Sequence, residues 1–165
     1  MTKQPAIDDN AIPAPDAVVD LGPLSGLTVY ALRNAQIALN KDFQHIMAQH
    51  DIRPAQFSVL EVIKRNPGLR QTQVSFSVGM KTTNFVPLLD ELERRGLAAR
   101  RPIAGDRRAR GLFLTQPGQD LLAQLEQLAT EHEARFVARI GADGRAQLLS
   151  LLHRLTDPAF DPPHG

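Results

Sequence analysis

A helical pattern stands directly before a charged hairpin pattern in residues 82–115, and this order restricts the fold more than any other feature of the chain. The large apolar residues that recur at the three- and four-residue steps of one helix face are Phe85, Leu88, Leu89 and Leu92. Gly96 follows them, where glycine commonly ends a helix in the left-handed conformation. We expect Thr82 or Thr83 to cap the start of this helix.

The residues after Gly96 predict two β-strands joined by a turn. The apolar residues that alternate along these two strands are Leu97, Ala99, Leu112 and Leu114. Gly105 and Asp106 supply residues that suit a tight turn between them. A hairpin in this position is the wing of a winged helix-turn-helix, provided that another helix precedes the first one closely.

Three further helices are expected before this stretch. The first spans about 27–50 and is apolar on more than one side, which is typical of a helix that packs beyond its own domain. The second starts at Arg53–Pro54, because proline suits the first turn of a helix, and ends at 66–68. A short helix over 71–78 and the turn 79–81 come next. Two helices joined by a tight glycine-containing turn form a helix-turn-helix.

Two more helices are expected after the hairpin, separated by a break at 142–144. With 165 residues, of which 42% are hydrophobic, the chain is long enough for one domain with a real core. The expected fold class is therefore mainly α with a small β-hairpin wing. The expected boundaries are a flexible acidic, proline-rich tail at 1–23, a single domain at 24–156 with its winged-helix lobe at about 53–115, helices at about 116–140 and up to 155, and a flexible tail at 157–165.

The formal net charge of +1 hides a strong asymmetry along the chain. Residues 1–22 hold one lysine and four aspartates, a net charge of −3, whereas residues 94–110 hold seven arginines and one aspartate, a net charge of +6. Positive charge gathered on a hairpin predicts a polyanionic partner such as DNA, because each cation placed at a phosphate releases counterions. A solvated hairpin with surface ion pairs is the alternative.

Other functions fit the sequence less well. Cysteine is absent, which excludes disulfides and thiolate metal sites. The sequence shows no glycine-rich phosphate loop, Ser-His-Asp cue or paired-carboxylate motif that would indicate an enzyme. The carboxylates Asp90, Glu91 and Glu93 fit a solvated helix face between arginines. His45 and His50 would point about 140° apart on a helix, which disfavours a metal-responsive regulator. A winged-helix protein–protein adaptor stays open, and the salt dependence of DNA binding would separate it.

Neither a membrane helix nor a signal peptide is indicated. No apolar run reaches the roughly 20 residues that span a bilayer, and the N-terminus lacks a basic and then apolar pattern. We therefore expect a cytoplasmic protein with no membrane partner, no cofactor and no metal site.

Four segments together resemble the MarR family of winged-helix transcriptional regulators. They are "PAQFSVLEVI" (54–63), "LLDELERRGLAARRP" (88–102), "GDRRARGLFLT" (105–115) and "PGQDLL" (117–122). They are similar to the family's second helix and to its L-x-x-L-E-x-x-G-L, D-x-R and L-T-x-x-G signatures, over about residues 27–155. The resemblance implies a homodimer joined through helices at about 27–50 and 116–155. Many members are repressors that a small aromatic ligand releases from a palindromic operator.

The resemblance also implies where DNA would bind. The helix after Lys81 would place its N-terminal residues at base edges in the major groove, and the hairpin would contact backbone and minor groove. Asp106 would pair with Arg108 and fix its direction. The expected DNA-binding residues are Thr72, Gln73, Lys81, Thr82, Thr83, Asn84, Val86, Asp106, Arg107, Arg108 and Arg110.

Some positions near this surface carry two interpretations. Pro87 departs from the family pattern, which often has a basic residue there, and a proline beyond the first turn would kink the helix. Arg94 and Arg95 suit the negative end of a helix dipole as well as they suit DNA. Arg100 and Arg101 either touch phosphate or cover a strand.

The expected effector site lies on the first helix. Its residues are Tyr30, Arg33, Asn34, Asn40 and His45. A ligand can supply the partners that buried polar groups need, and Arg33 could hold a carboxylate or phosphate; exposed or dimer-contacting side chains are the alternative. The segment "TNFVPLLDELERRGL" (83–97) is similar to MarR members that govern aromatic-acid degradation. That likeness implies a small aromatic or acyl-CoA effector, such as a hydroxycinnamoyl-CoA thioester.

Overall fold

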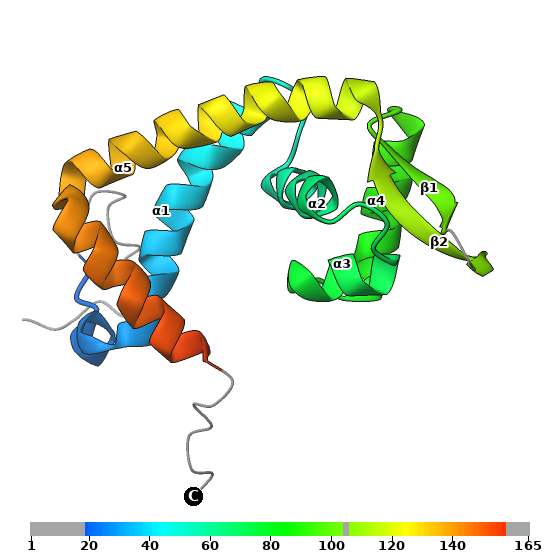
Figure 1. Ribbon diagram of the computed structural model, residues 1–165. Helices are drawn as coiled ribbons and strands as arrows, with labels where there is room; N and C mark the ends of the chain where they lie inside the picture. The colour runs from blue at the N-terminus through cyan, green and yellow to red at the C-terminus, as the bar shows by residue number, and fades with distance from the viewer. Residues whose placement is uncertain (1–18, 104–105, 158–165) are drawn as a thin grey trace, which may run out of the picture. The chain divides into compact units, whose positions relative to one another are not determined.

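The computed structural model describes residues 19–103 and 106–157, with only the backbone described at 106–109 (Figure 1). Most of the two predicted tails therefore lies outside the described residues. The chain divides into two compact units, Met1–Leu39 and Asn40–Gly165.

The first unit contains a short 3₁₀ helix and the start of the first long helix. The 3₁₀ helix η1 spans Gly22–Gly26, so the last residues of the predicted tail are in fact ordered into a turn that Pro23 starts. Helix α1 spans Thr28–Ala48 and continues into the second unit, and it ends before His50, which the predicted helix had included. Many apolar side chains of this unit stay exposed: Val19, Leu21, Leu24, Leu27, Val29, Leu32 and Ile37.

The second unit holds the predicted helix-turn-helix and its wing. After the end of α1 it contains α2 (Pro54–Arg65), α3 (Gln71–Ser77), α4 (Thr82–Arg94), β1 (Ala98–Ile103), β2 (Asp106–Leu114) and α5 (Gln116–Thr156). The two strands are antiparallel neighbours in one small sheet, and β1 also contacts α4 (Figure 1). The expected fold class, mainly α with a β-hairpin wing, is confirmed.

The core of this unit is assembled from every element between α1 and the first turns of α5. The predicted stripe of α4 is confirmed, because Phe85, Leu89 and Leu92 are fully buried and Leu88 packs against the same cluster. The buried residues of this core are Met47, Ile52, Val59, Leu60, Ile63, Val74, Phe85, Leu89, Leu92, Leu97, Ala98, Leu112, Leu122 and Leu125. Its burial stabilises the fold chiefly by removing apolar surface from water.

The loop between α2 and α3 extends the hairpin as a third strand would. The Gly68 N–H donates to the Leu112 carbonyl at 2.8 Å, and the Leu112 N–H donates to the Leu69 carbonyl at 2.9 Å. A Cβ on Gly111 would lie 2.5 Å from the Gly68 carbonyl oxygen, so only glycine allows this close approach. The wing is thereby held to the helix-turn-helix by backbone hydrogen bonds.

A second close approach joins α4, the wing and α5 at Gly96 and Leu97. Gly96 has φ +68°, which ends α4 as predicted, and the Leu97 N–H donates to the Leu92 carbonyl at 2.9 Å. The Thr115 N–H donates to the Leu97 carbonyl at 3.2 Å, while the Thr115 Oγ1 accepts from the Gly118 N–H at 3.1 Å. We call this group of four residues (Gly96, Leu97, Thr115 and Gly118) the wing-root junction.

Two predicted helix boundaries are wrong. Neither Thr82 nor Thr83 caps α4: Lys81 occupies the N-cap position, with no hydrogen bond from its side chain, and the two threonines already lie in the first turn. The break predicted at 142–144 lies at Gly141, whose φ of 74° and ψ of 165° are non-helical, while 142–144 are helical. Glycine at 141 tolerates this positive φ, which explains the shift.

Among the described residues, no helix combines the length and apolar character that crossing a bilayer requires.

Gly118→Ala tests the wing-root junction. A Cβ at this position would lie 1.9 Å from the Leu97 carbonyl oxygen, so the backbone of α5 or β1 must move. We expect the free energy of unfolding, measured by urea titration, to fall by about 3 kcal/mol, at the upper end of the usual cost of overpacking. Gly26→Ala is the matched control, because nothing lies within 4 Å of its added Cβ. Equal stabilities for the two variants would contradict the packing described for Gly118.

Candidate nucleic-acid interface

The N-terminal half of α4 presents its polar side chains to solvent. Lys81, Thr82, Thr83 and Asn84 are all exposed, and Val86 is half-buried. They share the end of the helix at which backbone N–H groups have no partner inside the helix, an end that favours negative charge. The structure therefore brings five of the predicted DNA-binding residues together on one exposed surface.

Pro87 is the sixth residue of α4, and the helix continues past it to Arg94. Proline has no N–H, so it cannot donate to the Thr83 carbonyl, four residues earlier, as an ordinary residue would. Its ring is exposed and lies outside the core. The helix tolerates this residue because the buried stripe on the opposite side holds both turns in place.

Helix α3 carries the other two predicted contacts outside the wing. Thr72 and Gln73 are exposed on its first turn. The Gln73 Oε1 also accepts the backbone N–H of Arg70 at 2.9 Å, so this side chain has a capping role that sequence reasoning did not anticipate. Its amide NH₂ group is the part that can donate to a phosphate.

The wing carries the remaining predicted residues. In the hairpin register Arg110 lies opposite Pro102, and its side chain is exposed. The side chains of Asp106, Arg107 and Arg108 lie outside the described residues, so the expected pair between Asp106 and Arg108 stays a prediction.

Arg100 fastens the first strand of the wing to α4. Its guanidinium bonds to the Asp90 carboxylate at 2.8 Å and also to the Glu93 carboxylate, and its backbone N–H donates to the Glu93 Oε1 at 2.7 Å. These bonds tie Arg100 to α4, whereas the guanidinium of Arg101, on the same strand, lies 5.7 Å from the centre of the Phe113 ring. Asp90 and Glu93 therefore bind a residue of the wing, and the helix face that they occupy is not purely solvated.

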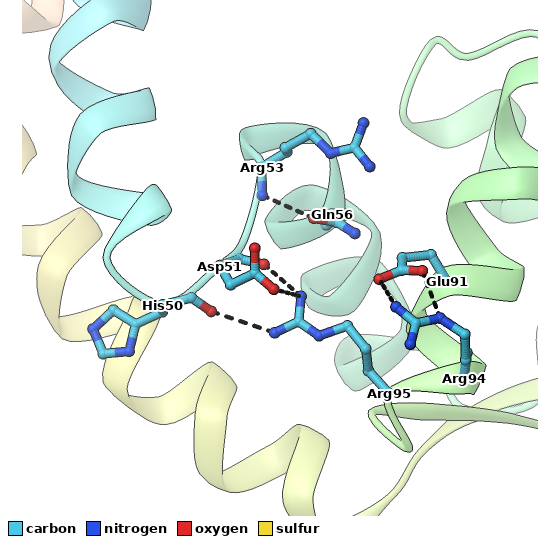
Figure 2. A network of polar contacts seen from close by, with 7 residues as sticks. All are labelled: His50, Asp51, Arg53, Gln56, Glu91, Arg94 and Arg95. Carbon is cyan, nitrogen blue, oxygen red and sulfur yellow. Dashed lines mark hydrogen bonds and ion pairs between the residues drawn. The ribbon is translucent and has the colours of Figure 1, made fainter.

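Arg95 reaches back from the end of α4 to the loop between α1 and α2 (Figure 2). Its guanidinium donates to the carbonyl oxygens of Asp51 and, at 3.3 Å, of His50. Asp51 has φ +55°, which is uncommon for a residue other than glycine, and the arginine stabilises the turn there. Arg95 therefore stands at the C-cap of α4, as the helix-dipole interpretation expects, and its guanidinium is directed into the protein.

Arg94, next to it, pairs with Glu91 on the same helix. Two hydrogen bonds of 2.9 and 2.6 Å join the guanidinium to the carboxylate (Figure 2). These hydrogen bonds from Arg94 lower the pKa of the Glu91 carboxyl below its ordinary value. The positive charge of Arg94 is thus partly neutralised by a neighbour three residues away.

A cluster of four charged residues joins α2 to α5. The Lys64 Nζ lies 2.5 Å from the Glu126 Oε1, and Arg65 contacts both Glu61, at 3.6 Å, and Glu126, at 3.9 Å. Burial, and then the nearby Glu126 carboxyl, raise the pKa of Glu61. The hydrogen bond from Lys64 lowers the pKa of Glu126. The two carboxyl groups are thus shifted in opposite directions: Glu126 loses its proton more readily, and Glu61 holds its proton more tightly.

Two open cavities flank this cluster. One, of about 590 Å³, lies between α2 and α5 and is lined by Phe57, Glu61, Lys64, Arg65, Glu126, Ala129, Thr130 and Glu133. The other, of about 420 Å³, lies at the base of the wing and is lined by Ile63, Lys64, Pro67, Arg101, Phe113, Leu114 and Gln119. None of the five predicted effector residues lines either cavity. Sequence reasoning had no signal for these cavities, because they form between elements that are distant in the chain.

The predicted effector residues lie on α1 as expected. Tyr30, half-buried, and the exposed Arg33 and Asn34 belong to the first unit, whereas the exposed Asn40 and His45 belong to the second. Their role stays a prediction. Within the described residues no group of three His, Asp or Glu side chains is placed to hold a metal ion.

Comparison with known proteins identifies the family of this chain. The family model for MarR matches residues 50–109. A Thauera aromatica protein described as a transcriptional regulatory protein for the hcr operon is 33% identical over 135 residues, which is 81% of both chains. The chain belongs to the MarR family. The resemblance found in the sequence is thereby confirmed, and the chain is a transcriptional regulator of that family.

Two solved structures of the MarR-family repressor CouR are similar to this chain. CouR bound to a 23-mer DNA duplex has a TM-score of 0.79 and 42% identity, and the match covers 84% of this chain and 99% of CouR. CouR bound to p-coumaroyl-CoA has a TM-score of 0.78 and 39% identity, covering 86% of this chain and 99% of CouR. These values confirm the winged-helix fold.

Arg100→Met tests the tie between wing and helix. The change leaves the carboxylates of Asp90 and Glu93 without their shared cation, so we expect the free energy of unfolding to fall by about 1.5–3 kcal/mol in urea titrations. Arg101→Met is the matched control on the next residue of the strand, where loss of the contact with Phe113 is expected to cost about 0.5–1 kcal/mol. A loss at Arg100 no larger than that at Arg101 would contradict the proposed tie.

The same substitution, glutamate to glutamine, is expected to have opposite effects on stability at two positions of the α2–α5 cluster. Because the pKa of Glu61 is raised in the folded protein, ionising it opposes folding as the pH rises. Glu61→Gln is therefore expected to be more stable than the unchanged protein at pH 7, with the difference shrinking toward pH 4. Glu126, with a lowered pKa, stabilises the fold above its ordinary pKa, so Glu126→Gln is expected to be less stable at pH 7. Urea titrations at several pH values measure both; the same sign for both variants would contradict the assignment.

Proposed function

We propose that this chain is a homodimeric repressor that binds a palindromic DNA operator and leaves it when an aromatic acyl-CoA thioester binds. The observation that carries this proposal is the exposed end of α4 beside a wing that Arg100 fastens to the same helix. CouR, to which the chain is similar, has been solved both on a DNA duplex and with p-coumaroyl-CoA. Such a regulator acts on chromosomal DNA, so we place it in the cytoplasm and assign it no catalytic step.

The proposed DNA contacts divide into three kinds. Thr82, Thr83, Asn84 and Val86 face base edges, where Asn can pair with adenine and the apolar groups can touch thymine methyls. Lys81 and the α3 residues Thr72 and Gln73 bind phosphate. The wing arginines Arg107, Arg108 and Arg110 enter the minor groove or follow its backbone, where the negative potential is strongest, and Asp106 orients Arg108.

Exposed apolar residues at both ends of the chain support the proposed dimer. Val29 is 72% exposed in the first unit, and Leu151 is 55% exposed near the end of α5. Isolated subunits rarely expose so many large apolar side chains together. A two-fold symmetric interface between copies would cover them, with the helices at about 27–50 and 116–155 as the contact elements.

The proposed effector is an aromatic acyl-CoA thioester such as a hydroxycinnamoyl-CoA. We propose that Tyr30, Arg33, Asn34, Asn40 and His45 contribute to its site. The ligand needs only to stabilise a dimer whose two α4 helices no longer match successive major grooves, which are about 34 Å apart. A preference of about 1–3 kcal/mol for that state reduces operator occupancy substantially.

Fluorescence anisotropy with a duplex from upstream of the protein's own gene tests the DNA part of the proposal. Binding is expected to be tight and to weaken steeply with salt, since several phosphates are neutralised. Arg108→Ala is expected to weaken binding and to lower the salt slope by about one, with an unchanged circular dichroism spectrum. Gln124→Ala, an exposed position on α5, is the control. Unchanged affinity in folded Arg108→Ala would contradict the role of the wing.

The same assay tests the effector. Addition of p-coumaroyl-CoA or benzoyl-CoA is expected to release the duplex at concentrations at which free coenzyme A has no effect. Calorimetry without DNA would confirm direct binding. If none of the thioesters gives heat or release, the effector proposal fails while the DNA-binding proposal stands.

A further inference from the structure

One aromatic ring on the helix-turn-helix is exposed for no reason that the fold supplies. Phe76, on α3, is 87% exposed, more than any other large apolar side chain among the described residues. The remaining exposed large apolar residues lie in 19–37 or in 140–155, that is, in the helices to which we assign the dimer interface or in the segment directly before the first of them. Phe76 lies outside both segments, so the proposed dimer does not account for it.

The position of Phe76 around α3 places it among the proposed phosphate contacts. At about 100° per residue, Phe76 lies about 40° from Thr72 and about 60° from Gln73, between the two. Val74 and Ser75 are buried on the other side of the helix. The exposed face of α3 thus contains two polar residues on the first turn, the phenyl ring directly behind them, and the polar Ser77 at the end of the helix.

A second copy of the chain is a poor occupant for this face. One phenylalanine offers at most about 250 Å² of surface, against about 800 Å² per partner in a standard interface. Apart from Phe76, the exposed residues of this face of α3 are polar. An apolar ring within an otherwise polar surface suits a ligand that itself mixes charge with small apolar groups.

We propose that Phe76 packs on apolar carbons of the DNA duplex, either thymine methyl groups at the groove edge or deoxyribose carbons of the backbone. This inference rests on the proposed placement of DNA against α3 and α4. Both kinds of carbon lie beside the phosphates that Thr72 and Gln73 are proposed to bind. The contribution of the ring is hydrophobic, so it adds affinity that salt does not weaken.

The test compares Phe76→Ala with Lys81→Ala and with Gln124→Ala as control, by anisotropy over a range of salt concentrations on the full-length protein. Phe76→Ala is expected to bind about tenfold more weakly with an unchanged salt slope. Lys81→Ala, which removes a phosphate contact, is expected to bind more weakly with a shallower slope. Phe76→Leu, which keeps an apolar side chain, is expected to retain most of the affinity. Because the ring is exposed, the melting temperature of Phe76→Ala is expected to stay unchanged.

A duplex with deoxyuridine in place of thymidine distinguishes the two sources of apolar carbon. If thymine methyls are the partner of Phe76, the deoxyuridine duplex weakens binding of the unchanged protein more than binding of Phe76→Ala, because any loss at α4 is common to both. If deoxyribose is the partner, the substitution leaves the effect of Phe76→Ala intact.

The results that would contradict the inference differ from those that would contradict the proposed DNA face. Full affinity in Phe76→Ala together with weakened binding in Lys81→Ala would overturn the inference and leave the proposed DNA face standing. Full affinity in both variants would overturn the DNA face itself. A change of oligomeric state in Phe76→Ala, measured by analytical ultracentrifugation, would overturn the inference in favour of a contact between copies.

Discussion

The close approach of Leu97 to Gly118 is the constraint on which the second unit depends. At this wing-root junction, backbone hydrogen bonds and one to the Thr115 hydroxyl link the end of α4, the residues that flank the hairpin and the first turn of α5. A side chain at 118 would collide with the Leu97 carbonyl, and Gly96 needs its positive φ to turn the chain. The glycines of this part of the sequence are therefore fixed by steric limits, and the angle between α4 and the wing follows from them.

Electrostatics then sorts the arginines of 94–110 into two groups. Arg94, Arg95 and Arg100 bond to carboxylates or carbonyl groups of the protein, and Arg101 lies on an aromatic ring. Arg95 and Arg100 join α4 to the loop at Asp51 and to the wing, whereas Arg94 is bonded within α4 and Arg101 lies within the hairpin. The net charge of +6 thus overstates what this segment can offer a polyanion. The charge proposed for DNA belongs to the wing arginines beyond Pro102 and to Lys81.

Local patterns were sufficient to predict α1 to α5, the hairpin and their order, but not the 3₁₀ helix η1. The buried stripe of α4, the helix start at Pro54 and the hairpin each follow from a few neighbouring residues, so their prediction needed no tertiary information. The prediction that Thr82 or Thr83 caps α4 was wrong because these residues lie one and two positions past the N-cap. Sequence alone does not distinguish an N-cap residue from a residue of the first helical turn. The protein partners of Arg95 and Arg100 and the exposure of Phe76 were missed for another reason: they depend on segments up to 45 residues away.

Helix α5 is bonded both to the wing and to α2. Its first turn is locked to the wing through Gly118, and further along Glu126 is bonded to Lys64 of α2. Arg100 ties the wing to α4, and Arg95 ties α4 to the loop before α2. These contacts join α2, α4, the wing and the start of α5 in a closed ring. Each contact therefore limits the movement of the elements that the other contacts join. A displacement of the first turns of α5, before the non-helical Gly141, is therefore passed to α2, α4 and the wing together. On the proposed function, an effector changes the spacing between the two lobes of a dimer and leaves the shape of each lobe unaltered.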